Sequence, residues 1–329
     1  MNPRSFLIIQ TAFIGDVILA TALIEKLHQF YPNANIDFLV RKGNETLLDN
    51  HPFLREVIVF DKKKKYRNLY ELLGRIRRTN YDVVVNVQRF ATTGFITVLS
   101  GAKETIGYNK NPLSFLFDRR IAHQIGEVHE VERNQRLIET LTDQVPANPK
   151  LYPSERDFEK VKVYQSESYY CIAPTSVWFT KQWPAEKWIE LIKFYQHRKI
   201  KSIYLLGAPI DHHVCESIRL ASGWNGVSNL AGKLTFLESA ALMKSALMNF
   251  VNDSAPMHLA SAMNAPVTAV YCSTVPSFGF GPLSDKSFAI ETKEKLACRP
   301  CGLHGFKNCP EGHFKCAYGI EIAVVASSS

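Results

Sequence analysis

The fold class of this chain is decided by Phe6-Leu7-Ile8-Ile9-Gln10-Thr11-Ala12-Phe13-Ile14-Gly15-Asp16-Val17. The first four residues form an apolar run typical of a buried strand, and apolar side chains recur at helical spacing over residues 17–27. The pattern therefore predicts a strand, a tight turn and a helix. In an open α/β sheet, such a turn lies at the carboxyl end of the strand, where ligands bind.

Asp16 is a single acid in the apolar neighbourhood of this turn. Its place at the tip of a strand makes it a candidate catalytic base, and Gly15 before it permits a left-handed or closely approached backbone. The same place suits a helix N-cap, which for Asp16 taken alone is the simpler interpretation.

Residues 1–25 also have a second interpretation as a secretory signal, because Arg4 precedes an apolar stretch and Ala20-Thr21-Ala22 resembles a cleavage site. Gln10 and Asp16 argue against it, since an amide and a carboxylate are costly inside the apolar part of a signal. No apolar run reaches the roughly 18 residues that span a bilayer. The sequence therefore predicts a cytoplasmic protein.

The composition indicates two globular domains. With 329 residues, 46% of them hydrophobic, the chain is too long for one ordinary core. The formal net charge is +8, and part of the excess lies in Lys62-Lys63-Lys64-Lys65 and in Arg67, Arg75, Arg77 and Arg78. A solvated helix face explains most of these residues, and attraction to an anionic partner is the sharper alternative.

Strand-like apolar runs alternate with helical patterns in both halves of the chain, which is typical of parallel sheets. A proline-rich stretch at 145–154 separates the halves. We predict an α/β fold of two Rossmann-like domains facing across a cleft, residues 1–155 and 156–329. The predicted strands are 5–10, 35–40, 56–60, 82–88, 169–173, 201–206, 248–252 and 267–271. The predicted helices are 17–30, 67–79, 130–143, 185–197, 211–222, 235–246 and 256–263.

A polar turn follows the buried strand near residue 250, in Phe250-Val251-Asn252-Asp253-Ser254-Ala255-Pro256-Met257-His258. Asp253 or Ser254 can cap the helix that follows, and Pro256 suits its first turn because it has no amide hydrogen. The free amides at such a helix start attract anions, so the turn would hold a diphosphate. An ordinary capped helix is the alternative.

Two further loops connect a strand to a helix. In the first, Lys181 could neutralise a phosphate leaving group, with Thr175 and Ser176 donating hydrogen bonds. The alternative makes Trp183-Pro184 a helix start and Lys181 a surface residue. In the second, Asp211 could accept hydrogen bonds from ribose hydroxyls or cap its helix.

In this order, the motifs resemble glycosyltransferase family 9, the ADP-heptose:lipopolysaccharide heptosyltransferases, over most of the chain. Their combination is more specific than any single motif. Many relatives also end in a cysteine-rich segment, like residues 298–316 here. The matching stretches are Gly15-Asp16-Val17, Tyr81 to Gln88, His129 to Asn134, Lys181-x-Trp183-Pro184, Asn229 to Lys233 and Asn252 to Ala260.

The resemblance implies a GT-B fold and an inverting transfer of heptose from ADP-heptose to the lipopolysaccharide inner core. Asp16 resembles the general base that deprotonates the acceptor hydroxyl, and Thr11, Phe13 and Gly15 in the same turn would contact the acceptor. Relatives often carry smaller or polar residues at Phe13-Ile14, so acceptor choice should depend on this departure.

In the second half, Lys181 resembles the lysine that contacts the donor diphosphate and would stabilise the leaving group with helix amides. Asp253 would hold donor-sugar hydroxyls. Relatives usually have glycine in place of Ala255, although a helical alanine still allows amide donation. The donor-binding residues implied are Thr175, Ser176, Asp211, Asp253, Ser254, Ala255, Met257 and His258.

The sequence contains no Asp-x-Asp pair, so neither a metal on the diphosphate nor another cofactor is expected. The implied partners are an ADP-linked sugar donor and a lipopolysaccharide core or lipid A precursor, with peripheral contact to the inner face of the cytoplasmic membrane and no nucleic acid. Two alternatives stay open. They are a sugar-nucleotide epimerase of similar two-domain fold and a non-catalytic binder of anionic polymers.

The seven cysteines form two groups. Three stand in apolar contexts typical of reduced core cysteines. The other four lie in the cysteine-rich tail (residues 298–316), where they could form a tetrahedral structural zinc site. Only the first pair has the usual ligand spacing, so reduced or partly paired thiols are favoured. The core cysteines are Cys171, Cys215 and Cys272, and those of the tail are Cys298, Cys301, Cys309 and Cys316.

Overall fold

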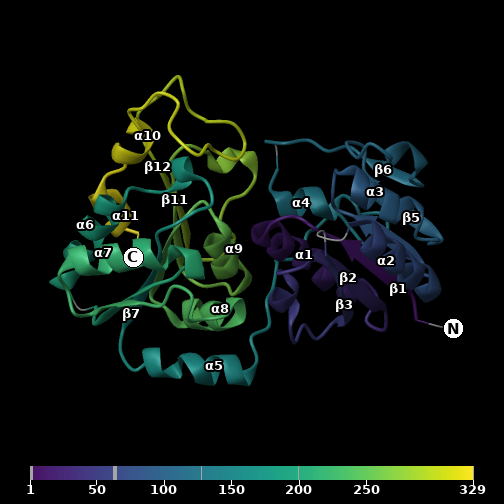
Figure 1. The fold of residues 1–329 in the computed structure, drawn as a ribbon, viewed down its shortest axis with the longest axis horizontal. Coiled ribbons are helices and arrows are strands. Elements are labelled where there is room, and N and C mark those ends of the chain that lie inside the picture. Colours follow the sequence, from purple (N-terminus) through teal and green to yellow (C-terminus); the bar gives the residue numbers. More distant parts are fainter. Residues whose placement is uncertain (1–2, 62–64, 127, 199, 329) are drawn as a thin grey trace. The chain divides into compact units, whose positions relative to one another are not determined.

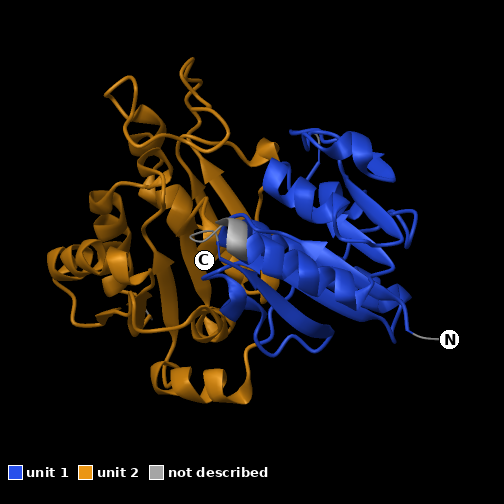
Figure 2. Ribbon diagram, turned by 45° about the vertical axis from the view of Figure 1, so that its right-hand side comes forward, with its two compact units in different colours: residues 1–152 blue, residues 153–329 orange. Residues whose placement is uncertain are grey.

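The computed structural model describes residues 3–61, 65–126, 128–198 and 200–328 (Figure 1). The chain divides into two compact units, Met1–Tyr152 and Pro153–Ser329, which Figure 2 colours blue and orange. The division predicted from sequence, after residue 155, falls within the first turn of helix α5 (Glu155–Val161). This helix packs against α8 (Phe236–Ser245) of the second unit, which explains why the structural division comes before it.

The first unit is a six-stranded parallel sheet in the order β3-β2-β1-β4-β5-β6. Its strands are β1 (Ser5–Ile9), β2 (Asn35–Arg41), β3 (Leu54–Phe60), β4 (Val83–Asn86), β5 (Glu104–Tyr108) and β6 (Arg119–Ile121). Its helices are α1 (Ile14–Phe30), α2 (Lys65–Thr79), α3 (Ala91–Val98) and α4 (Glu130–Gln135), with short 3-10 turns at η1 (Glu45–Leu48) and η2 (Ser114–Leu116).

The second unit is a parallel sheet of the same size, in the order β12-β11-β10-β7-β8-β9. Its strands are β7 (Tyr169–Ala173), β8 (Ser202–Leu205), β9 (Val227–Asn229), β10 (Met248–Asn252), β11 (Val267–Tyr271) and β12 (Ser287–Glu291). Its remaining helices are α6 (Ala185–Gln196), α7 (His212–Ser222), α9 (Ala255–Ala262), α10 (Lys315–Tyr318) and α11 (Ile322–Ala326). Short 3-10 turns lie at η3 (Lys162–Tyr164), η4 (Phe179–Lys181), η5 (Pro209–Asp211) and η6 (Pro276–Phe278).

The two sheets have the same topology. Numbered from its own first strand, each follows the order 3-2-1-4-5-6, which is the doubly wound arrangement of dinucleotide-binding folds. The strand order reverses between β1 and β4 in the first unit and between β7 and β10 in the second. Ligands bind at such switch points, outside the carboxyl ends of the strands. The predicted fold of two Rossmann-like α/β units is confirmed, and the cleft between them stays a prediction.

The central strand β1 is buried along its length, because it has strands on both edges and packed layers on both faces. Leu7 and Ile9 contact Leu39 of β2 and Val84 of β4 in the first core. Residues 1–25, for which a secretory signal was the alternative interpretation, thus supply this central strand and most of helix α1.

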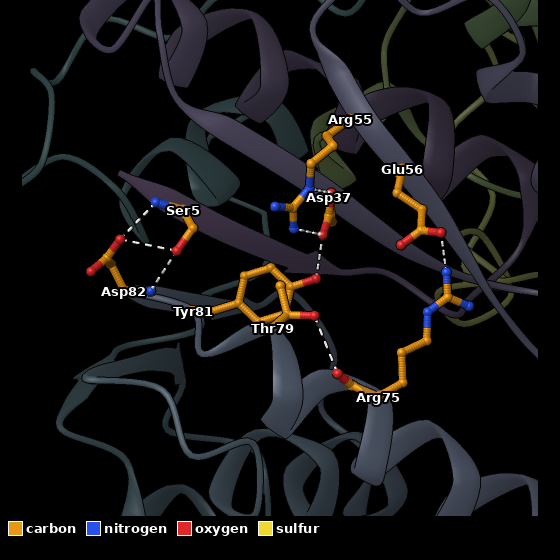
Figure 3. Close-up of polar contacts among 8 residues, drawn as sticks. All are labelled: Ser5, Asp37, Arg55, Glu56, Arg75, Thr79, Tyr81 and Asp82. Carbon is orange, nitrogen blue, oxygen red and sulfur yellow. Dashed lines mark hydrogen bonds and ion pairs between the residues drawn. The ribbon is translucent and has the colours of Figure 1, made fainter. Parts of the chain in front are cut away.

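Polar contacts at the amino ends of the strands fix the register of the first sheet (Figure 3). The buried carboxylate of Asp37 on β2 accepts hydrogen bonds from the Arg55 guanidinium and the Tyr81 hydroxyl. Asp82, just before β4, accepts from the amide and hydroxyl of Ser5. Hydrogen bonds lower the pKa of Asp82 to about 2. The bond from Lys103 has the largest effect, and those from Ser5 add to it. These charges support the sheet and lie opposite the ligand-binding edge.

The structure differs from the predicted elements at several points, and the helices α3, α5, α10 and α11 were not predicted. Helix α1 begins at Ile14, and the helix predicted over 130–143 ends at Gln135 and continues as turns. The prediction missed β5, β6, β9 and β12, which are short or partly exposed and lack a long apolar run. In the basic run, residues 62–64 lie outside the described residues.

Candidate active site

Asp16 is the third residue of helix α1, just after the loop that follows β1. The helix is capped at Phe13, so the predicted N-cap at Asp16 is wrong, although one Asp16 carboxylate oxygen accepts a hydrogen bond from the Phe13 amide at 3.2 Å. Gly15 is helical, and the left-handed backbone that it permits is not adopted. The side chain stands at the carboxyl edge of the sheet beside the switch point.

A second carboxyl group lies near Asp16 and was not among the predicted site residues. Glu130 begins α4, which packs against α1, and its buried carboxylate is 2.6 Å from a guanidinium nitrogen of Arg133. Burial raises the pKa of Glu130 most strongly, Arg133 opposes this, and the charge of Asp16 raises it further. Glu130 and Asp16 thus lie in one electrostatic environment.

The predicted acceptor contacts differ in their exposure. The side chain of Phe13 is 58% exposed, with the Arg41 guanidinium 4.8 Å from its ring centre, whereas Thr11 is buried. Thr11 is therefore poorly placed to touch a substrate. Across the switch point, the Gln88 amide donates to the Gln10 side chain and ties the loops after β1 and β4 together.

In the second unit, Lys181 and Asp253 come together at the switch point. Lys181 ends η4 after β7 and Asp253 follows β10, and the Lys181 ammonium lies 2.6 Å from an Asp253 carboxylate oxygen. The hydroxyl of Thr274, which sequence analysis did not single out, donates to the same oxygen at 2.6 Å. The Lys181 side chain is only 15% exposed, so its interpretation as a surface residue is wrong.

The loop that carries Lys181 is held from two sides. The Asn252 side chain accepts a hydrogen bond from the Trp183 amide at 2.8 Å. On the other side, the Thr180 hydroxyl accepts from the Phe306 amide at 2.7 Å. Gly305 has a φ of +78°, and a Cβ there would lie 2.8 Å from the Thr180 hydroxyl oxygen. The cysteine-rich tail therefore packs directly against the lysine loop.

The start of helix α9 has no side-chain cap. Ser254 occupies the N-cap position, but its hydroxyl donates to the Asn252 carbonyl, and Asp253 is engaged by Lys181. The predicted capping by either residue is therefore wrong. Ala255 is helical, so it needs no glycine conformation, and its amide has no partner within the helix. The Met257 amide donates to the Ser254 carbonyl and is already engaged.

The remaining predicted donor residues are less favourably placed. Thr175 and Ser176 are partly buried, and their carbonyls accept from the side chains of Asn252 and Gln182. The Asp211 carboxylate accepts from the Ala208 amide at 2.8 Å, which supports its interpretation as a local cap. The side chains of Met257 and His258 are buried.

The four tail cysteines line one cavity of about 250 Å³, together with His313. They are free thiols, and the Cys298 sulfur lies 4.0 Å from Nε2 of His313. Burial raises the pKa of Cys316 to about 11, which disfavours its thiolate. Within the described ranges, no three His, Cys, Asp or Glu side chains are arranged to hold a metal ion. The structural zinc site stays a prediction.

The chain is similar in sequence to known glycosyltransferases. The sequence model of glycosyltransferase family 9 (heptosyltransferase) matches residues 69–304. Lipopolysaccharide heptosyltransferase 3 of Escherichia coli strain K12 is 26% identical in an alignment 277 residues long, which covers 79% of this chain and 80% of that protein.

Two solved structures show the same fold. A glycosyl transferase family 9 protein of Veillonella parvula superposes with a TM-score of 0.87 at 20% identity, covering 100% of this chain and 96% of the other. ADP-heptose lps heptosyltransferase II of E. coli gives 0.80 at 22% identity, covering 98% and 97%.

The fold of two Rossmann-like units is that of these solved glycosyltransferases. The chain belongs to glycosyltransferase family 9, the heptosyltransferases. The family predicted from the sequence motifs is therefore confirmed, and the roles of individual residues remain proposals.

Proposed function

We propose that this enzyme transfers a heptose from ADP-heptose to the inner core of lipopolysaccharide. The observation that carries the proposal is the Lys181–Asp253 pair beside the uncapped start of α9, at the switch point of the second sheet. A cation, an acid and helix amides are the groups that a nucleotide diphosphate joined to a sugar requires. Relatives named as lipopolysaccharide and ADP-heptose heptosyltransferases support the choice of donor and acceptor.

The chemistry is a single inverting displacement. The Asp16 carboxylate takes the proton of an acceptor hydroxyl, whose oxygen forms a bond to the anomeric carbon of the donor sugar. The bond from that carbon to the diphosphate breaks, and its electron pair leaves with ADP. Lys181 and the Ala255 amide stabilise the charge that develops on the leaving oxygen. Because attack and departure occur on opposite faces, the anomeric configuration inverts.

The resting structure adds one requirement. Lys181 is neutralised by Asp253 at 2.6 Å, so a diphosphate must compete with that carboxylate for the ammonium group. Asp253 is then available to accept hydrogen bonds from donor-sugar hydroxyls, as the family resemblance implies. On donor binding, Lys181 thus exchanges Asp253 for the diphosphate, and Asp253 exchanges Lys181 for the sugar hydroxyls.

The acceptor places the reaction at the inner face of the cytoplasmic membrane, with peripheral contact. Within the described part of the chain, every helix is too short or too polar to cross a bilayer. No cofactor is proposed.

Incubation of the purified protein with ADP-heptose and a heptose-free core acceptor tests the proposal. A heptosylated product of inverted anomeric configuration, with equimolar ADP, is expected by mass spectrometry and NMR. Isomerised nucleotide sugar formed without acceptor would indicate an epimerase, and binding without turnover would indicate a non-catalytic binder. A parallel reaction in EDTA should proceed at the same rate, because Lys181 and helix amides replace a metal ion.

A further inference from the structure

The first unit contains a cavity of about 380 Å³ that the catalytic groups above do not use. Its volume lies in the range of ligand pockets. We call it the cationic pocket, and it is lined by Arg89, Phe90, Lys110, His123 and Ile125.

The pocket lies at the ligand-binding edge of the sheet. Arg89 and Phe90 follow β4, Lys110 follows β5 and His123 follows β6, so all come from segments after the carboxyl ends of parallel strands. Asp16 comes from the loop after β1, which neighbours β4 in the sheet. Parallel strands have their carboxyl ends at one edge, so the pocket and Asp16 share that edge. The charges of Arg89 and Asp16 both act on Glu130.

Hydrogen bonds of a buried side chain hold the loops that form the pocket in place. Asn111 is 2% exposed, and its side-chain amide donates to the carbonyls of Gln88 and Phe90 at 3.2 and 3.0 Å. These bonds tie the loop after β4 to the loop after β5. Gly94 leaves the room that Asn111 needs, because a Cβ there would lie 2.4 Å from the Asn111 oxygen. Arg89 and Lys110 are thus presented from two loops that are fixed to each other.

Among the described residues, the cations of the pocket have no carboxylate partner, unlike the cations at the opposite edge of the sheet. At the amino edge, the cations Arg55, Lys103 and Arg119 each pair with a carboxylate. The ion pairs of the described part of this unit include neither Arg89 nor Lys110.

His123 adds to this pattern. Its ring lies edge-on to Tyr108, and burial, together with the charges of Arg89, Arg133 and Lys110, lowers its pKa to about 4. Glu130, the acid whose pKa responds to Arg89, is already paired with Arg133. The pocket thus has two cations, a neutral imidazole and two exposed apolar side chains, Phe90 and Ile125.

Building on the proposed function, we propose that the cationic pocket binds an anionic substituent of the acceptor, a phosphate or a carboxylate on the sugar that receives the heptose. Arg89 and Lys110 supply charge-assisted hydrogen bonds, and the apolar side chains of Phe90 and Ile125 contact the sugar ring. The pocket thereby sets acceptor specificity by holding the sugar at the edge where Asp16 takes the proton.

The double variant Arg89→Gln/Lys110→Gln tests the proposal kinetically. It should raise KM for the acceptor about 10–100-fold, as expected for lost charge-assisted contacts, with kcat and the KM for ADP-heptose unchanged. The control is Arg120→Gln, which removes a charge from an exposed residue of β6 outside the lining. An unchanged acceptor KM in the folded double variant, or an equal rise in the control, would overturn the proposal.

Two acceptor analogues distinguish the source of the anion. If the substituent is a phosphate, an enzymatically dephosphorylated acceptor should show the raised KM with the wild-type enzyme, and the double variant should lose nothing further. If it is a carboxylate, an acceptor with its carboxyl reduced to the alcohol should show the raised KM with the wild-type enzyme and no further rise with the double variant. An acceptor that lacks both groups yet keeps its KM would contradict the assignment.

A binding measurement separates this proposal from the proposed function. Titration of inorganic phosphate should shift the ring resonances of His123 and raise its pKa, since a bound anion stabilises the imidazolium. The double variant should show neither change. If the wild type transfers no heptose yet shows these shifts, the proposed function fails and the anion site stands. If phosphate leaves His123 unchanged in the wild type, the anion site is refuted.

Discussion

The two sheets share one topology but differ in the charges at their switch points. In the second unit, the cation follows the first strand and the acid follows the fourth, and Lys181 and Asp253 neutralise each other. In the first unit, the order is reversed: Asp16 follows the first strand and Arg89 follows the fourth. There the loops are joined by the uncharged pair Gln10 and Gln88, and Arg89 faces a cavity.

This difference separates two ways of preparing a binding site. A site whose charges are already paired is stable without its ligand, but the ligand must displace an internal partner. A site with unpaired cations attracts an incoming anion without the displacement of an internal partner. On this view, the second unit selects its ligand by competition, and the first unit selects it by the charge that the ligand brings.

Asp16→Asn should give the largest effect, a loss of about 100-fold or more in kcat, the usual contribution of a positioned general base. Donor affinity should stay nearly unchanged, because the donor groups lie in the second unit. Removing the Asp16 charge should also lower the pKa of Glu130, measurable by NMR. Near-normal turnover in the folded variant would reduce Asp16 to its contact with the Phe13 amide.

The Lys181–Asp253 pair should respond asymmetrically to substitution. Lys181→Ala should weaken ADP and the intact donor alike, by roughly 10–100-fold, because both carry the diphosphate. Asp253→Asn should leave ADP binding unchanged or tighter, since the ammonium loses its competitor, and should weaken the intact donor. Calorimetry with both ligands measures this. Equal losses for ADP and donor in both variants would show that the two residues do not divide phosphate from sugar.

The first unit should be the more sensitive to acid. Burial and His28 lower the pKa of His51 to about 4 from an ordinary 6.5, so the stability that its neutral form contributes is present above pH 6.5 and is lost as the pH falls toward 4. The loss is on the order of 3 kcal/mol.

All four tryptophans lie in the second unit, at residues 178, 183, 188 and 224. Circular dichroism should therefore change at a higher pH than tryptophan fluorescence, and His51→Gln should narrow the gap. Coincident transitions in the wild type would contradict the assignment.

Gly305→Ala should give the smallest effect. The variant puts a Cβ 2.8 Å from the Thr180 hydroxyl oxygen and 3.1 Å from Cγ of Lys181, so it should weaken ADP binding several-fold as well as lower Tm. Gly312→Ala is the matched control, because its φ is similarly positive at +69° and nothing lies within 4 Å. Backbone strain should lower the free energy of unfolding of this variant by about 1–2 kcal/mol, and with it the Tm. ADP affinity should stay unchanged. Identical ADP affinity in both variants would show that the tail does not position Lys181.

The sequence predicts those parts of this molecule that depend on neighbouring residues. The strand β1, the loop with Asp16 and the turn with Asp253 follow from apolar runs that end in polar residues. Lys181 was identified in the same way, from its place between β7 and α6. The fold class could therefore be predicted before any strand order was known.

The features that the sequence did not predict depend mainly on contacts between residues that are distant in sequence. Glu130 was visible in a motif, but its proximity to Asp16 comes from the packing of α4 on α1. The contact between Thr180 and Phe306 joins residues 126 positions apart, and no local pattern indicates it. The edge strands β6 and β12 were missed because partial exposure removes the apolar signal.

The last residues of the chain lie within the core of the second unit, and this has a consequence for synthesis. Trp183 donates to the Ala317 carbonyl, Tyr195 donates to the Ala326 carbonyl, and the hydroxyls of Thr268 and Ser328 lie 2.6 Å apart. The first unit is complete at residue 152 and is free to fold while the ribosome is still translating. The second unit cannot close its core until residue 328 has left the exit tunnel, so a nascent chain presents a finished first unit long before the second unit can form its switch-point site.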